Sequence, residues 1–198
     1  MRRFAVPMVL GALAMTAVTS RAEAQPNIFF GGGPSFPVGS FKTNPDPSPP
    51  NFEAKTGWLL QGGIGVDIGS RGLFIEAEGF FGSNSHDNTG NAKDKTNIIA
   101  FMGALGYSFG GEEAKVSPYV LAGAGILGNQ FRSDDDALAD LEGTENEFGY
   151  TGAVGVSFRL NETARFWIEG RYLGSSSTKL IPFAAGVSLT LGGGGGGM

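Results

Sequence analysis

The sequence predicts an all-β protein: an eight-stranded antiparallel up-and-down transmembrane β-barrel with short periplasmic turns and longer extracellular loops. Three observations support this fold. Seven of the eight stretches that read as strands alternate apolar with small or polar residues. The chain opens with a signal typical of export. After this signal, no apolar run approaches the ~20 residues that a membrane helix needs. Because lipid cannot hydrogen-bond an open backbone, strands in a membrane must close into a barrel.

Residues 1–24 are predicted to form a cleaved secretory signal peptide. Arg2 and Arg3 give a basic start, the run FAVPMVLGALAMTAV is apolar, and Ala22-Glu23-Ala24 is a small-x-small cleavage site. Gln25 is then the expected first residue of the mature protein. Because a membrane barrel crosses the inner membrane unfolded, we expect the general secretory route.

Composition narrows the possible functions. The chain has no cysteine, which excludes a lipid-modified N-terminal cysteine, disulfides and thiolate chemistry. Its net charge is −5; removal of three arginines and one glutamate with the signal leaves 11 basic and 18 acidic residues, or −7. This argues against nucleic-acid binding. Residues 25–191 are expected to form one barrel domain, and residues 192–198, six glycines and a methionine, a disordered tail.

The clearest strand is TGWLLQGGIGVDIG. It places Trp58 and Ile64 on one face and Gln61 and Asp67 on the other, as expected where the two faces meet different surroundings. The first strand is the least regular, because its prolines remove ladder donors. The fifth is ambiguous about which face points outward. The expected strands are 27–41, 56–69, 73–81, 99–109, 118–132, 148–160, 166–172 and 182–191.

The connections alternate in length, as the two sides of an outer-membrane barrel require. Short joins are expected after the second, fourth and sixth strands. Loops 42–55, 82–96 and 133–146 are expected to be extracellular and to offer surfaces to a partner. The last join on that side, 174–179, is brief.

Aromatic residues are expected to form two girdles at the membrane interfaces. The predicted short-turn girdle contains Tyr107, Phe109, Tyr119, Phe158 and Phe166. The predicted long-loop girdle contains Trp58, Phe81, Phe131, Phe148, Tyr150, Tyr172 and Phe183.

Charged residues at inward positions predict an ion-pair network in which Arg159 and Arg171 face the acidic side chains. Eight strands leave an interior just wide enough for side chains to fill, so a structural plug is expected, with a gated ion path as the alternative. The inward charged set is Asp67, Glu76, Glu78, Arg159, Glu169 and Arg171.

No catalytic, cofactor-binding or metal site is expected, and no cofactor. His86 stands beside Ser85 and Asp87, but adjacency in sequence does not make a catalytic triad, and the segment reads as a flexible polar loop. The acidic run 134–147 could hold Ca²⁺, but it lacks EF-hand spacing and is expected to be a solvated loop.

Four short motifs carry a resemblance to a known family: GGGPSFPVGSF, PYVLAGAG, IEGRY and GVSLTL. With these, the chain resembles the small eight-stranded outer-membrane barrels of Gram-negative bacteria, the opacity-protein and OmpA-like superfamily. The resemblance implies a monomer in the outer-membrane bilayer beside lipopolysaccharide. It also implies insertion by the barrel-assembly machinery, whose terminal signal Gly186, Leu189 and Leu191 match. The glycine tail departs from the aromatic end common in the family.

The sequence therefore favours a non-enzymatic outer-membrane barrel of structural or surface-interaction type. Three alternatives remain open: a barrel that binds or transports a small apolar ligand or lipid, a lipid-modifying outer-membrane enzyme, and a soluble periplasmic lipocalin-like carrier. The carrier would need apolar residues inside and polar residues outside, the reverse of the predicted pattern.

Overall fold

The structure is a computed structural model that describes residues 26–42, 53–68, 72–87, 94–110, 114–132 and 143–191. The predicted signal peptide 1–24, the glycine tail 192–198 and most of the acidic run, 133–142, lie outside these residues. No helix in the described ranges is long and apolar enough to cross a membrane. The long strands are β1 (Pro26–Pro37), β3 (Gly57–Ile68), β4 (Leu73–Asp87), β5 (Asp94–Ser108), β6 (Val116–Arg132), β7 (Gly143–Arg159), β8 (Ala164–Gly174) and β9 (Lys179–Thr190).

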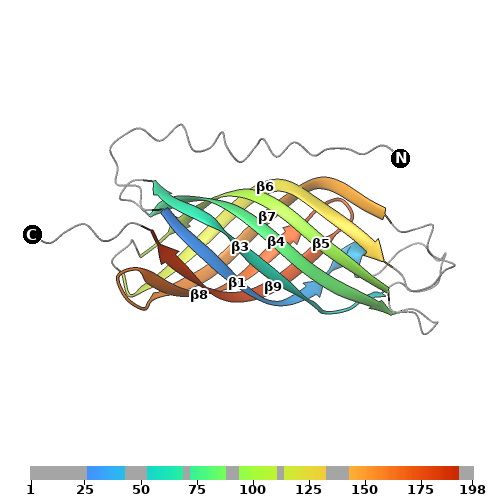
Figure 1. Cartoon of the computed structure of the whole chain (residues 1–198), viewed down its shortest axis with the longest axis horizontal. Coiled ribbons are helices and arrows are strands. Elements are labelled where there is room, and N and C mark those ends of the chain that lie inside the picture. Colours follow the sequence, from blue (N-terminus) through green and yellow to red (C-terminus); the bar gives the residue numbers. More distant parts are fainter. Residues whose placement is uncertain are drawn as a thin grey trace, which may run out of the picture.

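These eight strands close into one antiparallel barrel, which confirms the predicted fold (Figure 1). Each long strand pairs with the next along the chain, and β1 closes the cylinder against β9. The start of β1 and the end of β9 lie at the same end as the joins β3–β4, β5–β6 and β7–β8, on the left in Figure 1. We call this the short-turn end and the opposite one the long-loop end.

Two short elements follow β1 at the long-loop end. Residues 39–41, predicted to continue the first strand, instead form the 3-10 helix η1 (Gly39–Phe41). Pro37 ends the ladder, and Gly39 then adopts a φ of 59° that favours glycine. The two-residue strand β2 (Glu53–Ala54) pairs with β4 beyond the last residue that β3 reaches.

The outer face of the barrel is an apolar belt. Along β5, Ile99, Phe101 and Leu105 point outward and are 44–69% exposed, while Met102 and Ala104 between them are buried. The other long strands alternate in the same way, so the predicted outward position of the large apolar residues is confirmed. On β6, where the sequence was ambiguous, Val120, Ala122 and Ile126 face outward.

The strands are unequal, and part of the predicted loops is sheet. β4 to β7 have 15 to 17 residues, whereas β1, β3, β8 and β9 have 11 or 12. Residues 82–87 and 94–96 belong to β4 and β5, which pair as far as His86 and Asp94. Residues 143–146 belong to β7, and 53–54 to β2. The prediction failed here because strands beyond the bilayer meet water on their outer face, so the apolar alternation stops before the hydrogen-bonded ladder does.

The inward charges had suggested a lumen that is polar throughout, and this is wrong. Its long-loop half contains a tightly packed apolar layer, and several of its side chains are at most 1% exposed. These inward residues were overlooked because the expectation of a polar barrel interior assumed water inside, whereas eight strands leave room only for packed side chains. The layer consists of Leu59, Phe80, Ile98, Ala100, Met102, Leu127, Leu173 and Leu180.

Candidate functional site

Arg171 on β8 forms the centre of a buried ionic layer at mid-barrel. Its guanidinium lies 2.7 Å from the Oε2 of Glu78 on β4 and 2.8 Å from the Oε1 of Glu169, and these side chains are at most 2% exposed. It also donates to Thr151 Oγ1 and stacks over the Phe80 ring at 5.0 Å. The predicted pairing of Arg171 with inward carboxylates is confirmed. The alternation on β4 and β8 points all three side chains into the lumen, where they meet.

Two further groups complete the layer around Glu169. Gln61 donates from Nε2 to Glu169 Oε1 at 3.2 Å, and the Tyr119 hydroxyl donates to Oε2 at 3.0 Å. Tyr119 was predicted to be a girdle residue, and this is wrong. It occupies an inward position of β6, the strand whose facing the sequence left unresolved, so its ring cannot reach lipid.

Arg159 does not join this layer, which corrects the second half of the ion-pair prediction. It is the last residue of β7 and is exposed at the short-turn mouth, where its Nε donates to the carbonyl of Asn161. Arg165, which sequence reasoning missed, points inward instead and donates to Ser117 Oγ at 2.9 Å and to Ser157 Oγ at 3.2 Å. Extending the alternation of the seventh strand back from Phe166 would have found it.

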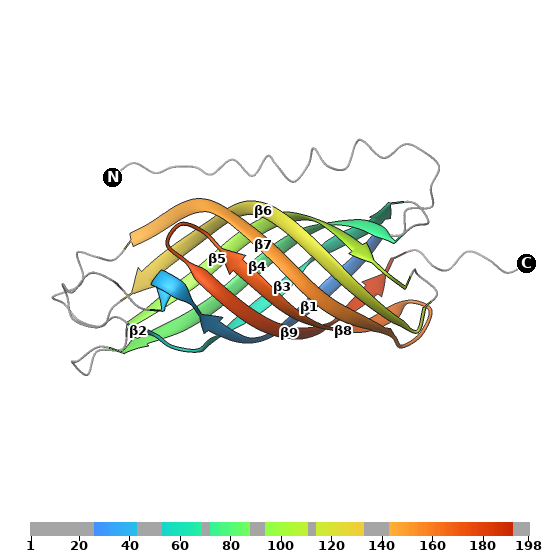
Figure 2. The same ribbon diagram turned by 180° about the vertical axis from the view of Figure 1, so that it is seen from behind.

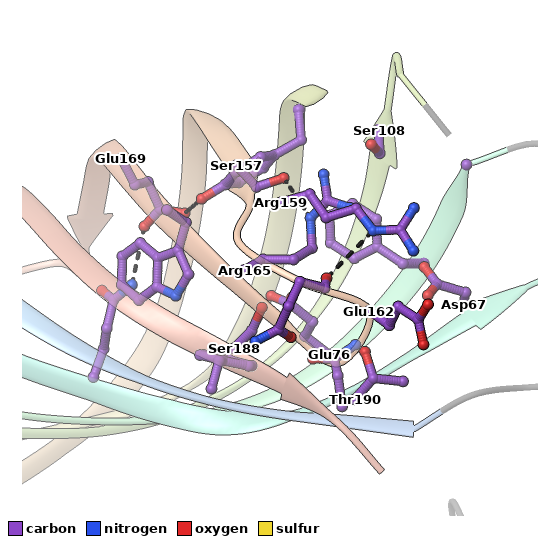
Figure 3. A pocket seen from close by; sticks show the side chains of 18 of the residues that line it. Asp67, Glu76, Ser108, Ser157, Arg159, Glu162, Arg165, Glu169, Ser188 and Thr190 are labelled. Carbon is purple, nitrogen blue, oxygen red and sulfur yellow. Dashed lines mark hydrogen bonds between the residues drawn. The ribbon is translucent and has the colours of Figure 1, made fainter. Parts of the chain in front are cut away.

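Between the ionic layer and the short-turn mouth lies a cavity of about 420 Å³ (Figure 3). Its lining reaches from Arg171 and Glu169 down to Asn161 and Glu162 in the β7–β8 turn. The walls between carry acidic, basic, hydroxyl and aromatic groups. Among them are Asp67, Phe74, Glu76, Ser108, Trp167, Ser188 and Thr190.

Glycines in the wall explain why the cavity is open although four large rings line it. Each ring occupies the space that a side chain on a neighbouring strand would fill, so that a Cβ added to the glycine would overlap the ring. The rings therefore lie against the wall and leave the lumen centre free. The pairs are Phe29 with Gly63, Phe74 with Gly106, Tyr119 with Gly155, and Trp167 with Gly31 and Gly186.

At the other end of the lumen, His86 is held inside the barrel and not in a flexible loop. Its ring lies between Phe41 of η1 and Phe131 of β6, with centroid separations of 6.1 and 6.0 Å. Its Nε2 is 2.8 Å from Thr96 Oγ1. Phe131, predicted to be a girdle residue, therefore faces inward. Ser85 precedes His86 on the opposite, exposed face of β4, so this serine does not converge with the imidazole.

The short β8–β9 turn is tied across the long-loop end. Glu147 of β7 accepts hydrogen bonds from Ser176 Oγ at 2.7 Å and from the Ser177 amide at 3.2 Å. Thr178 Oγ1 donates to Asn129 of β6 at 2.8 Å. Glu147, the last residue of the predicted acidic run, thus binds a turn. Within the described ranges, no group of three or more histidine or acidic side chains is arranged to hold a metal ion.

A closed antiparallel cylinder with an apolar belt outside and packed side chains inside defines a transmembrane β-barrel. The chain matches the family model described as outer membrane protein beta-barrel domain over residues 8–192, and it belongs to that family. It is an outer-membrane protein, with its short turns facing the periplasm.

Solved structures show the same fold at low sequence identity. Neisserial surface protein A is 13% identical with a TM-score of 0.61, over 84% of this chain and 97% of that one. Ail, the attachment invasion locus protein of Yersinia pestis, is 12% identical with a TM-score of 0.53, over 86% and 100%. OprG of Pseudomonas aeruginosa is 16% identical with a TM-score of 0.50, over 85% and 97%. Among curated proteins, no sequence matches the chain.

Proposed function

We propose that this protein is a non-enzymatic outer-membrane barrel of structural or surface-interaction type, whose lumen is plugged by its own side chains. The observation that carries the proposal is the stacking of two buried layers. The apolar layer around Leu59, Ile98 and Leu127 lies directly above the ionic layer of Arg171. Water and ions would have to displace both layers to pass.

Conductance in planar bilayers tests the plug. The purified protein is expected to give no porin-type current steps, with a wide porin measured in the same bilayers as a positive control. A matched double variant, Phe80→Ala with Leu173→Ala, removes bulk from the apolar layer and is expected to raise the current. Stable wild-type current of porin size would overturn the proposal.

The surroundings of His86 support the absence of catalysis. The imidazole contacts two phenyl rings and a threonine hydroxyl inside the barrel, and Ser85 points away from it. His86→Ala is expected to leave the mass spectra of the surface lipids unchanged. Loss of a lipid modification in this variant, with normal outer-membrane amounts of the protein, would identify an enzyme.

The longer strands support a role at the cell surface. On β5 and β6, the outward residues above the belt are polar: Lys95, Asn97, Gln130 and Arg132 stand beyond Ile99 and Ile126. The strand ends at which β5 begins and β6 ends therefore lie above the apolar belt. We propose that the segments between β4 and β5 and between β6 and β7, with 42–55, contact an extracellular partner or lipopolysaccharide, and that the protein acts as a monomer inserted by the barrel-assembly machinery. Whole-cell binding with each segment replaced by Gly-Ser would test the contact.

The lumen does not favour the apolar-ligand alternative. That function requires an apolar void, whereas the apolar layer is packed and the open cavity carries charged and hydroxyl groups beside its aromatic rings.

A further inference from the structure

The ionic layer and the cavity beneath it contain more buried acid than base. Glu78 and Glu169 are buried and bind one guanidinium, that of Arg171, and the half-buried Glu76 lines the cavity beneath them. Among the residues that the structure describes, Arg171 is the only basic side chain that is buried. Uncompensated negative charge is costly in a barrel interior, so the arrangement favours an additional cation.

Glu76 is the carboxylate that this cation would meet. Glu78 and Glu169 bind Arg171, but in the described part of the chain neither a hydrogen bond nor an ion pair engages Glu76. Its side chain lines the cavity (Figure 3). Glu76 is the fourth residue of β4, and Trp167 is the fourth residue of β8. Because both strands begin at the short-turn end, both residues lie near that end of the barrel.

A second observation points to a ligand that donates hydrogen bonds. Gln61 is 3% exposed and lines the same cavity, and its amide nitrogen donates to Glu169. Because a carboxylate only accepts, this bond fixes which end of the amide is the carbonyl. The carbonyl Oε1 is buried and meets no donor among the described residues. A buried acceptor that meets no donor loses about 1–3 kcal/mol, which a ligand N–H would restore.

Trp167 calls for a hydrogen-bond acceptor on the same ligand. It is 5% exposed, and its indole Nε1 is a buried donor that meets no acceptor within the described ranges. Its ring, with those of Phe29 and Phe74, also lines the cavity. Aromatic faces attract organic cations, and an indole does so best.

We propose that this cavity binds a small organic ammonium ion that also carries a hydroxyl or carbonyl group, with Glu76 as its counter-ion. The ammonium group pairs with Glu76 and donates to the Gln61 carbonyl, and the acceptor of the ligand receives the Trp167 N–H. A volume of about 420 Å³ lies within the range of small-molecule sites, roughly 300–1,000 Å³. Because the lining reaches the β7–β8 turn, the ligand enters from the periplasm. The apolar layer above stops it, so the cavity is a binding site and not a passage.

Fluorescence of Trp167 tests the proposal directly. The chain has two tryptophans, and Trp58→Phe removes the one that faces lipid. The folded full-length protein with this change is titrated with 4-aminobutan-1-ol, which is an ammonium ion at neutral pH. Butane-1,4-diol is the neutral probe of matched size, and sodium chloride controls for ionic strength. The expected result is a saturable shift of the emission with the aminoalcohol alone.

A matched pair of variants locates the counter-ion. Glu76→Gln is expected to weaken aminoalcohol binding at least tenfold. Glu145→Gln removes one exposed carboxylate at the opposite end of the barrel and is expected to leave binding unchanged. Each variant must first show the mobility shift on boiling that marks a folded barrel.

Three results would overturn the proposal: no saturable shift with the aminoalcohol, an equal shift with the diol or the salt, or full binding by folded Glu76→Gln. The comparison of the two probes uses no change at Glu76, so the proposal stays testable even if that variant does not fold. Binding in the cavity does not depend on the proposed plug, and the titration can succeed or fail whether or not the barrel conducts. Only the statement that the ligand does not pass the apolar layer rests on the plug, and the conductance measurement tests it separately.

Discussion

Arg171 is the residue on which the barrel interior depends most. It contacts Glu78, Glu169, Thr151 and the Phe80 ring, and its side chain is 2% exposed. A buried charge is stabilised by its partners only while all of them are present, because each partner left alone keeps the cost of its desolvation.

We therefore predict that Arg171→Ala lowers the free energy of unfolding by about 3–5 kcal/mol, since it leaves two carboxylates buried without a cation. Urea unfolding in lipid vesicles measures this change. Arg159→Ala is the matched control: its side chain is exposed at the mouth, so a change within about 0.5 kcal/mol is expected. Equal effects of the two substitutions would contradict the layered interior.

The pairs of ring and glycine give a second prediction at this scale. Gly106→Ala on β5 places a methyl group where the Phe74 ring lies, and is expected to destabilise the fold by about 1–3 kcal/mol through overpacking. Gly103→Ala, on the same strand, meets nothing within 4 Å. It is expected to be neutral in the same unfolding measurement. A neutral Gly106→Ala would mean that the ring is free to move from the wall.

At the scale of the strand, β5 shows where the membrane ends. Its outward side chains are apolar at Phe101 and Ile99 and polar at the next two outward positions, Asn97 and Lys95. The backbone pairing with β4 nevertheless continues to Asp94. The strand is thus one structural unit in two solvents.

We predict that Phe101→Arg costs about 2–4 kcal/mol of stability, because it places a charge in the lipid near mid-membrane. Asn97→Arg faces the same way on the same strand but above the belt, and is expected to cost less than about 1 kcal/mol. Unfolding of both variants in vesicles of one lipid composition tests the boundary. If Asn97→Arg costs as much, the belt extends higher than the aromatic pattern indicates.

The elements also show how far the sequence could be used. Where the outer face of a strand meets lipid, the alternation predicted the strand, the face that points outward and the fold, as on β3 with Trp58 and Gln61. It failed where both faces of a strand are polar, which is why His86 was placed in a loop although it lies in β4. It also could not orient Tyr119, because small residues on both faces of β6 left no polarity to interpret.

Within the site, half of the ion-pair network was predictable, and the cavity was not. Alternation alone turns Glu78, Glu169 and Arg171 inward, and charge then requires them to pair. The position of Arg159 depends on how far β7 descends before its turn, which composition does not fix. The cavity results from rings that lie over glycines of other strands, and those contacts follow from the closure of the barrel, not from local sequence.

At the scale of the whole molecule, the belt and the family membership place the barrel in the outer membrane, and the basic-apolar start predicts how it arrives there. We predict that the protein purified from outer membranes begins at Gln25, since Ala22-Glu23-Ala24 fits the cleavage rule. Intact-mass spectrometry would show a chain lacking its first 24 residues. An uncleaved mass in the folded, heat-modifiable fraction would contradict this prediction.

The strands β4 to β7 extend further toward the long-loop end than the other strands, and this has a practical consequence (Figure 2). The described ends of β4 and β5, and those of β6 and β7, are already paired with one another above the lipid, as far as His86 with Asp94 and Phe131 with Gly143. A foreign peptide grafted between Asp87 and Asp94 would thus start from a fixed base outside the cell, and its length would not disturb the anchor. The barrel is therefore a ready scaffold for displaying epitopes on living bacteria.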